Sequence, residues 1–361
     1  MENYCGLVNT GNFCYFISIL QNLRFTKSII KYICDENEHH KDLKLLEFIK
    51  TSDEEFLKKN ETFFKKAVLY LNFKKIILNM CSSKDNKPIH INDFLKSCYR
   101  VSIGTNNQEL FSGNQNCSGE FIQFLVDVLH DTKKKDGFKL TFNNLKECKS
   151  NKDSIIYNCE KSLQSHFNNN YSWIIKEFNI TLCNKLCCNN CEYYTINYEP
   201  LFILLVPIPL HLENVNIEDC LDSYTKKEIF EHNEEWVCEK CDNKTGNYRQ
   251  CKLYNSPSTL IIQLTRFTYD IKTSYANKIT SFIKYNEILN MKNYKLFDEN
   301  ENNIYELYGI LCHIGELNMG HYYTYCKEDK SFYLFNDANV TKSETFPIDK
   351  NAYILFYRLK K

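Results

Sequence analysis

The stretch GLVNTGNFCYFISILQNL, residues 6–23, changes from turn-forming to helix-forming residues at one cysteine, Cys14. Asn9, Gly11 and Asn12 precede the cysteine and are residues that favour turns. After Cys14, apolar residues recur at the three- and four-residue spacing of a helix face. The stretch therefore predicts a helix that begins at Cys14. A helix N-terminus carries partial positive charge and lowers the pKa of a thiol beside it, so this position suits a nucleophile.

Composition indicates a folded protein without a broad basic face. Of the 361 residues, 43% are hydrophobic and 25% are charged, which is ordinary for a globular chain. Lysine plus arginine number 45, as do aspartate plus glutamate. This balance argues against nucleic-acid binding through a positively charged surface, and we expect no nucleic-acid partner.

The chain carries no pattern typical of secretion or of a membrane span. Its first residues lack a basic start followed by an apolar run, and no window holds about 18 uninterrupted apolar residues. We therefore expect no membrane association and a cytoplasmic or nuclear location. The 18 cysteines should then be mostly reduced thiols, whose functional uses are metal binding and nucleophilic catalysis.

Secondary-structure patterns predict an α+β fold. Up to about residue 135, apolar residues recur at helical spacing, for example in residues 62–77 and 119–129. From about residue 180, short runs rich in β-branched and aromatic residues appear, such as TLIIQLTRF (residues 259–267) and AYILFYRL (residues 352–359). We expect a helical half followed by an antiparallel β half.

Two C-x-x-C pairs in the β-rich half predict a zinc site. Cys188 and Cys191 form the first pair, and Cys238 and Cys241 form the second. A two-residue gap lets both thiolates of a pair face one ion, and two pairs complete a tetrahedral four-thiolate site of the zinc-ribbon kind. Four cysteines leave no open coordination position, so the predicted zinc is structural. Cys187 is an alternative to Cys188, but only Cys188 repeats the spacing of the second pair.

A histidine and an amide near the end of the chain could complete a catalytic set with Cys14. His321 begins an alternating aromatic run, and Asn336 and Asp337 end the next short apolar run. On adjacent antiparallel strands, one of these side chains would lie beside the imidazole. A cysteine nucleophile needs such a set, because a histidine takes the thiol proton and a third group orients the ring. With 18 cysteines and 9 histidines, an inert thiol and a packed histidine remain the alternative.

The chain resembles the ubiquitin-specific proteases over almost its whole length. Residues 6–23 are similar to the cysteine box of that family. The other similar stretches are HIGELNMGHYYTYC (313–326) with FYLFNDANV (332–340) for its histidine box, EFNITLCNKLCCNNC (177–191) and EEWVCEKC (234–241) for its fingers, and SPSTLIIQLTRF (256–267) and AYILFYRL for its later strands. They follow the family's order from Gly6 to Leu359.

This resemblance implies a papain-like fold in the shape of a right hand. It implies one catalytic domain over residues 1–361, with a helical thumb over about 1–135 and β-rich fingers with a zinc ribbon over about 175–255. Residues 136–174 and 256–361 would form the antiparallel β palm and connecting elements. Members of the family hydrolyse the bond after the C-terminal glycine of ubiquitin. The resemblance therefore implies a monomeric thiol-dependent deubiquitinase whose partners are ubiquitin and ubiquitinated proteins.

Matched positions carry the family's active-site roles onto this chain. Cys14 would be the nucleophile and His321 the general base. Asn336 falls at the third triad position, and Asp337 beside it would assist. Asn9 matches the side chain that donates to the oxyanion.

The family reads the ubiquitin tail partly through a Gln-x-Asp-Ala-x-Glu-Phe segment, which aligns with QNCSGEF, residues 115–121. The resemblance assigns substrate contact to Gln115, Glu120, Phe121 and Gly320. Cys117 replaces the acidic residue and Ser118 the alanine, so one charge facing the basic tail is missing, and we expect weaker or altered tail recognition. Ile17 also departs from the family, in which many members carry asparagine.

Three other functions fit parts of the pattern. A weakly active or inactive ubiquitin-binding scaffold is compatible with the change at Cys117, although Cys14, His321 and Asn336 are all present. A protease for a ubiquitin-like modifier would use the same residues. A zinc-ribbon protein that binds nucleic acid is disfavoured by the net charge of zero.

Overall fold

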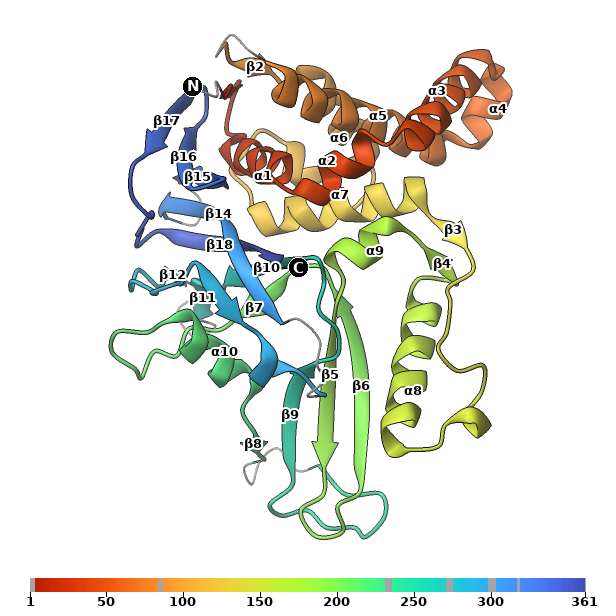
Figure 1. Cartoon of the computed structure of the whole chain (residues 1–361), viewed down its shortest axis with the longest axis vertical. Helices are drawn as coiled ribbons and strands as arrows, with labels where there is room; N and C mark the ends of the chain where they lie inside the picture. Colours follow the sequence, from red (N-terminus) through yellow and green to blue (C-terminus); the bar gives the residue numbers. More distant parts are fainter. Residues whose placement is uncertain are drawn as a thin grey trace.

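A helical region packs on a large β-sheet, and a smaller β-sheet extends away from both (Figure 1). The protein is described by a computed structural model, which covers residues 4–83, 87–230, 236–270, 275–297, 303–316 and 319–360. The helical region comes first in the chain and most strands follow it. This arrangement confirms the α+β fold class and the hand of thumb, palm and fingers expected from the sequence.

The thumb is built from helices, several of which begin at a polar cap. They are α1 (Cys14–Arg24), α2 (Lys27–Ile33), α3 (Glu36–Thr51), α4 (Glu54–Lys59), α5 (Glu61–Ser82), α6 (Asn92–Ser102) and α7 (Ser118–Lys133). The Asp35 carboxylate accepts the Glu38 N–H at 3.0 Å, and the Asp53 carboxylate accepts the Phe56 N–H at 2.8 Å. Within the described ranges, no helix has the length and apolar character needed to cross a bilayer.

Helix α1 is buried between the thumb and the palm. It packs against α5 and α7 on one side and against strands β14 (Ile304–Gly315) and β15 (Gly320–Glu328) on the other. All 11 of its residues are buried. Asn22 Nδ2 donates to Thr324 Oγ1 at 2.9 Å. Strand β14 comes so close at Gly309 that a Cβ atom would lie 2.1 Å from Asn22 Oδ1, so glycine is required there.

In the part of the chain that the structure describes, the palm is an eight-stranded sheet. Its further strands are β7 (Leu204–Val206), β10 (Thr259–Leu264), β13 (Ile288–Asn290), β16 (Ser331–Asn336), β17 (Asn339–Ser343) and β18 (Ala352–Leu359). The strand order is β17-β16-β15-β14-β18-β10-β7, and β13 pairs with β14. The pairing of β7 with β10 is parallel, whereas the other pairings of the sheet are antiparallel. Strand β7 thus joins the palm, although it lies in the range expected for the fingers.

Both faces of the palm sheet are covered. Along β18, Ile354 and Phe356 pack into the core shared with the thumb, whereas Leu355 and Tyr357 pack into a second core on the opposite face. Successive side chains of a strand point to opposite faces, so a strand buried on both sides has a continuous apolar sequence. This explains the apolar run AYILFYRL.

The fingers are a four-stranded antiparallel sheet of β5 (Ile180–Cys187), β6 (Tyr194–Leu201), β8 (Glu228–Ile229) and β9 (Tyr248–Leu253). Helix α8 (Asn151–His166) runs beside β6, where the Tyr198 hydroxyl donates to the Ile155 carbonyl at 3.3 Å (Figure 1). The remaining α-helices and strands are β1 (Leu7–Val8), β2 (Ile89–His90), β3 (Lys135–Asp136), β4 (Asn170–Tyr171), α9 (Trp173–Phe178), α10 (Ile217–Thr225), β11 (Phe267–Asp270) and β12 (Tyr275–Lys278).

A buried ion cluster holds α3 against the rest of the thumb. Asp42 is 4% exposed, and no other residue of this fully described helix is buried. Its carboxylate accepts hydrogen bonds from Lys74 Nζ at 2.7 Å, Lys133 Nζ at 2.6 Å and the Tyr70 hydroxyl at 3.0 Å. Lys74 lies on α5 and Lys133 on α7, so one carboxylate joins three helices.

We predict that Asp42→Ala lowers the free energy of unfolding by about 3–5 kcal/mol, because it leaves the buried Lys74 ammonium without its counter-charge and Lys133 with only Glu38, at 3.4 Å. The matched control is Asp93→Ala, which removes the exposed ion pair with Lys75 (3.3 Å) and should cost at most about 1 kcal/mol. Urea unfolding followed by circular dichroism measures both. Equal losses in the two variants would contradict the structural role given to Asp42.

Candidate active site

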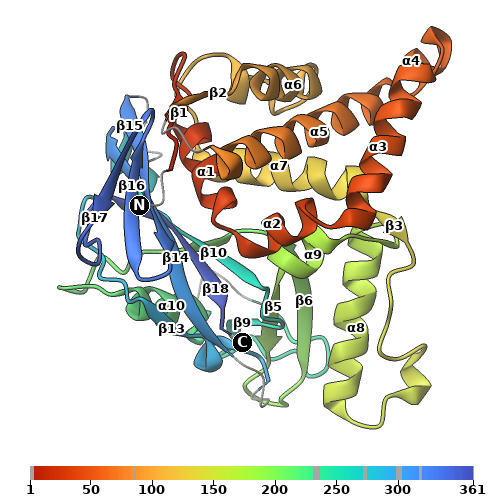
Figure 2. The ribbon, with the colours of Figure 1, turned by 45° about the horizontal axis from the view of Figure 1, so that its top comes forward.

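Three segments that are far apart in the chain meet at the start of α1. Cys14 is the first residue of α1, His321 is the second residue of β15, and Asn336 is the last residue of β16. Helix α1 packs directly on β15, and β15 pairs with β16 (Figure 2). The structure therefore brings together the nucleophile, the base and the third group expected from the sequence.

The ring of His321 is oriented by Asn336. His321 Nε2 lies 2.7 Å from Asn336 Oδ1. An amide oxygen only accepts hydrogen bonds, so Nε2 carries a hydrogen and donates it. In the neutral ring, Nδ1 then holds the lone pair and is the atom that can take a proton from Cys14.

The surroundings of His321 raise its pKa to about 9. The largest cause is the side-chain hydrogen bond with Cys14. Burial acts in the opposite direction because it disfavours the charged ring, while the bond with Asn336 and the nearby charges of Cys14 and Asp337 add to the increase. The site thus favours the protonated, imidazolium form of His321 beside the Cys14 sulfur.

Asn9, the expected oxyanion donor, is held in place at both ends of its amide. Its Nδ2 donates to Asp337 Oδ2 at 3.1 Å. Its Oδ1 accepts the backbone N–H groups of Gly11 and Phe13, each at 3.2 Å. These bonds use one of the two Nδ2 hydrogens and leave the second free to donate to another group. Asp337 therefore contacts Asn9 directly and influences His321 only through its charge.

The N-terminal segment braces Asp337. The Leu7 N–H donates to the Asp337 carbonyl at 2.9 Å. Asp337 has a φ of 51°, a left-handed conformation that aspartate tolerates better than most residues. Gly6 touches Ala338 so closely that a Cβ atom would lie 2.2 Å from its carbonyl oxygen. The segment before Cys14 thus also fixes the turn that follows β16.

A polar cleft of about 720 Å³ opens beside the reacting pair. It is lined by Asn12, Glu109, Ser112, Asn114, Gln115, Asn116, Met319 and Gly320. The side chain of Gln115 bonds to both the N–H and the carbonyl of Gly320, the residue before His321. Gln115 therefore joins the thumb to the palm at the cleft, and Cys14 beneath is only 2% exposed.

Two other residues matched to the tail-reading segment lie in different surroundings. Glu120 is exposed on the first turn of α7. Phe121 is fully buried, with its ring centroid 4.4 Å from that of Phe16. Burial places Phe121 in the core of the thumb and not on the cleft surface, which corrects the expectation of direct substrate contact. Ile17 is likewise buried, so its departure from the family pattern is accommodated by apolar packing.

Cys117, at the position of the missing acidic residue, lies against a tyrosine. Its Sγ is 3.5 Å from the Tyr353 hydroxyl oxygen, which also accepts a hydrogen bond from Gln263 Nε2 at 2.9 Å. The neighbouring Ser118 hydroxyl is buried beside Tyr322. The thiol therefore joins a neutral polar cluster where the family carries a negative charge.

No sequence pattern singles out Lys278, the last residue of β12. Lys278 Nζ donates to the carbonyls of His313 and Gly315 at 2.8 and 2.7 Å and lies 3.0 Å from His313 Nδ1. Burial, with the charges of Lys278 and His321, lowers the pKa of His313 to about 4, so that ring is neutral. The two residues fix the end of β14, from which the chain returns to His321. A lysine whose partners are mainly backbone oxygens leaves no motif in a sequence.

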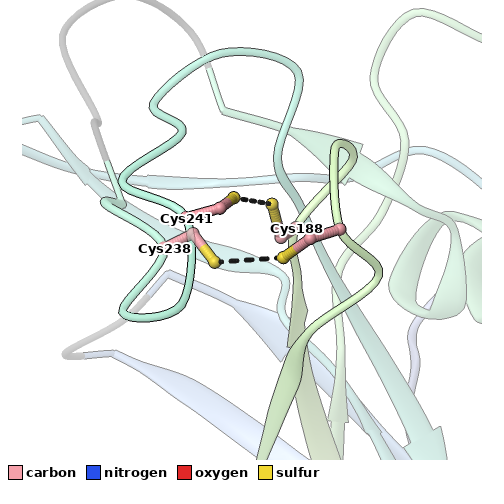
Figure 3. Close-up of side chains that lie close together, drawn as sticks. Cys188, Cys238 and Cys241 are labelled. Carbon is pink, nitrogen blue, oxygen red and sulfur yellow. Dashed lines mark hydrogen bonds between the residues drawn. The ribbon is translucent and has the colours of Figure 1, made fainter.

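The four cysteines predicted to bind zinc lie together beside the fingers sheet (Figure 3). Their sulfur atoms are all within 4.8 Å of one another. Cys188 Sγ lies 3.6 Å from Cys241 Sγ, and Cys191 Sγ lies 3.6 Å from Cys238 Sγ. Tetrahedral bonds of about 2.3 Å place the sulfurs around one zinc about 3.8 Å apart, so this donor set fits a structural metal ion. Cys187 lies outside the cluster, with its Sγ 3.8 Å from the Cys188 carbonyl.

Comparison with known proteins agrees with this geometry. The chain is 30% identical to ubiquitin carboxyl-terminal hydrolase 5 of Saccharomyces cerevisiae, over 98% of this chain and 44% of that protein. It is 26% identical to ubiquitin carboxyl-terminal hydrolase 4 of the same yeast, over 98% of this chain and 39% of that protein. The chain thus spans about two-fifths of the length of these relatives.

A solved structure shares the fold. The SAGA Ubp8/Sgf11/Sus1/Sgf73 DUB module bound to ubiquitin aldehyde contains a chain that is 24% identical, with a TM-score of 0.72, over 100% of this chain and 70% of that one. The family model described as "Ubiquitin carboxyl-terminal hydrolase" matches residues 5–357, which include every residue of the site. The chain therefore belongs to the ubiquitin carboxyl-terminal hydrolase family.

Proposed function

We propose that this chain is a cysteine-type deubiquitinase, which hydrolyses the peptide or isopeptide bond after the C-terminal glycine of ubiquitin. The observation that carries the proposal is the placement of His321, which bonds to Asn336 through Nε2 and to Cys14 on its other side. Membership of the family supports the choice of substrate. The structural neighbour is a module bound to ubiquitin aldehyde, which supports ubiquitin as the partner.

The first step of the reaction uses the Cys14–His321 pair. The Cys14 thiolate attacks the carbonyl carbon of the terminal glycine, and the carbonyl oxygen becomes an oxyanion. The free Nδ2 hydrogen of Asn9 and the backbone N–H groups at the start of α1 are suited to meet that charge. Because Asp337 and two backbone N–H groups already fix Asn9, the donor does not have to reorganise during the reaction.

The second and third steps move protons through His321. The imidazolium gives its Nδ1 proton to the leaving amine, which departs and leaves a thioester on Cys14. The neutral ring then takes a proton from water, and the resulting hydroxide attacks the thioester and releases the ubiquitin tail. Asn336 keeps the ring aimed at the sulfur throughout, but as a neutral amide it lends no full charge to the imidazolium.

The cleft supports recognition of a tail without bulky side chains at its end. Gln115 and Gly320, which are bonded to each other, both line the cleft, and this supports the proposal that they contact the extended tail. Because Cys117 supplies no charge, the contribution of an ion pair to a basic tail is lost here, which leaves affinity for the tail weaker than in a member with an acidic residue. Glu120 is the exposed carboxylate of that segment.

We further propose that Cys188, Cys191, Cys238 and Cys241 bind one structural zinc ion. The ion would hold the two C-x-x-C turns together and so fix the end of the fingers sheet; it takes no part in the reaction. Cysteines without disulfide partners throughout the described part of the chain suit a reducing compartment, and we propose a cytoplasmic or nuclear location on that basis.

The proposed activity predicts a covalent adduct between Cys14 and ubiquitin that carries an electrophile at its C-terminus. The wild-type protein should gain the mass of one ubiquitin, because the thiolate attacks the electrophile at the position of the scissile carbonyl. Intact mass spectrometry detects the adduct. Cys14→Ala should form none, whereas Cys34→Ala, which removes an exposed thiol, should react fully. A wild-type protein that binds ubiquitin without forming the adduct would support the inactive scaffold instead, and an adduct only with a ubiquitin-like modifier would redirect the substrate.

The pKa of His321 predicts the alkaline limit of activity. Because the ring must carry a proton for the amine to leave, kcat/KM for a ubiquitin amide should fall as the pH rises through about 9. Asn336→Ala removes a hydrogen bond that raises the pKa of His321. The alkaline limb of the pH–rate profile should therefore move to lower pH, and kcat should fall about tenfold to a hundredfold.

The control for this prediction is Asn336→Asp, which keeps the hydrogen bond and adds a negative charge. That charge stabilises the imidazolium, so the alkaline limb should move to higher pH than in the wild type. A pH–rate profile of the three proteins measures the shifts. Identical alkaline limbs in all three would contradict the link between Asn336 and the ring.

The proposed zinc site predicts one zinc ion per chain. Native mass spectrometry of the intact protein should show it, and Cys238→Ser should lose it together with several kcal/mol of stability in the fingers, because structural zinc binding contributes directly to folding. Cys187→Ser is the matched control: its sulfur lies outside the cluster, so the metal should remain bound. Retention of zinc by Cys238→Ser would rule out the four-thiolate set.

A further inference from the structure

A second groove lies in the thumb. It has a volume of about 500 Å³ and is lined by residues of α3, α4, α5 and α6. Its walls are mainly apolar and include Ile49 of α3, Leu57 of α4, and Phe64 and Val68 of α5. The cleft at Cys14 shares none of these residues. The volume is within the range of about 300–1,000 Å³ typical of binding pockets in proteins.

The arm formed by α3 and α4 adds exposed apolar surface beside this groove. Phe48 and Phe56 are 45% and 42% exposed, and their ring centroids lie 5.8 Å apart. The centroids of both rings also lie within 6.0 Å of that of Phe64 in the groove wall. Helix α4 buries no residue. A connected cluster of exposed aromatic rings beside an apolar groove is typical of an interaction surface, since isolated apolar residues are common on surfaces but clusters are not.

The rim of the groove is positively charged. Lys58 of α4 and Arg100 of α6 both line it, both are exposed, and neither makes a hydrogen bond or ion pair with any described residue. Lys65 is paired with Glu61 at 2.9 Å, and Glu61 is the one acidic residue of the lining. The rim therefore has two cationic groups free for a partner, and complementary charge on that partner would be negative.

We propose that this groove binds an amphipathic helix of a partner protein, with an apolar face that fills the groove and acidic side chains that meet Lys58 and Arg100. An apolar groove between helices accommodates another helix through large apolar side chains spaced three and four residues apart. A basic segment such as the ubiquitin tail would be repelled by the rim. The occupant is therefore not the basic tail that the Cys14 site is proposed to take.

The groove lies apart from the cleft beside Cys14 and His321. Helices α3 and α4 form the end of the thumb that lies opposite strands β15–β17 in both views of the molecule (Figures 1 and 2). A helix bound there leaves the cleft at His321 open. The surface would therefore select which proteins are brought near the site, without changing the reaction itself.

The experiment uses a fluorescent synthetic helix with leucines at three- and four-residue spacing on one face and glutamates beside them. Fluorescence anisotropy should show binding to the intact protein, and a second helix with lysines in place of the glutamates should bind about tenfold more weakly. The double variant Lys58→Glu/Arg100→Glu should reverse this preference. The matched control Lys59→Glu/Lys96→Glu changes the same charge on α4 and α6 outside the groove and should keep the wild-type preference.

A substitution of Leu57, in the apolar wall of the groove, tests the apolar contact with the bound helix. Leu57→Glu should abolish binding of the acidic helix, and its circular dichroism should match that of the wild type because Leu57 is only partly buried. Equal binding of both helices, or an unchanged preference in Lys58→Glu/Arg100→Glu, would overturn the proposal. So would sedimentation showing a dimer that Leu57→Glu breaks while neither helix binds, since a second copy of this chain would then be the occupant.

Discussion

The complete burial of α1 is the constraint on which the rest of the structure depends. This helix has no solvent-exposed face, so its neighbours on all sides must be in place before its first residue has a defined position. The bond from Asn22 to Thr324 and the close approach at Gly309 fix it against β14 and β15. Because β15 also carries His321, the packing that buries the helix is the same packing that sets the sulfur beside the ring.

Beside this helix, Asn336 at the end of β16 and Asp337 after it contact different residues of the site. Asn336 orients the imidazole, and Asp337 orients Asn9. The left-handed φ of 51° at Asp337 ends the strand just after Asn336, so two adjacent side chains can contact two different groups, the ring of His321 and the amide of Asn9. The N-terminal segment closes the arrangement, since Leu7 bonds to Asp337 and Asn9 follows two residues later. Charge, orientation and backbone support are therefore supplied by a few residues at one junction of thumb and palm.

Sequence reasoning could identify those parts of the site that have a local pattern. The turn-to-helix change at Cys14, the paired spacing of Cys188 with Cys191, and the alternation after His321 are all properties of short segments. The contact of Asp337 with Asn9 and the bonds of Lys278 depend on how distant segments pack, so no local pattern marks them.

Two departures from expectation have the same origin in long-range packing. Phe121 belongs to a motif that borders the cleft, but its direction on α7 turns it into the core. Strand β7 falls within the range expected for the fingers, yet it pairs with β10 of the palm, which is distant in sequence. The local sequence determines neither which side of a helix faces the core nor which strand a short strand pairs with.

The separation of 302 residues between Asn22 and Thr324 has a consequence for biosynthesis. Contacts so distant in sequence form late, since the entropy of closing the intervening loop must first be overcome. While the ribosome is still making the palm, α1 has helical neighbours in the thumb but no sheet to cover its other side. During that interval the apolar side of α1 and the Cys14 thiol stay open to solvent, and exposed apolar surface of this kind is where folding intermediates tend to associate. The arrangement of Cys14, His321 and Asn336 therefore forms only after strands β15 and β16 have been translated.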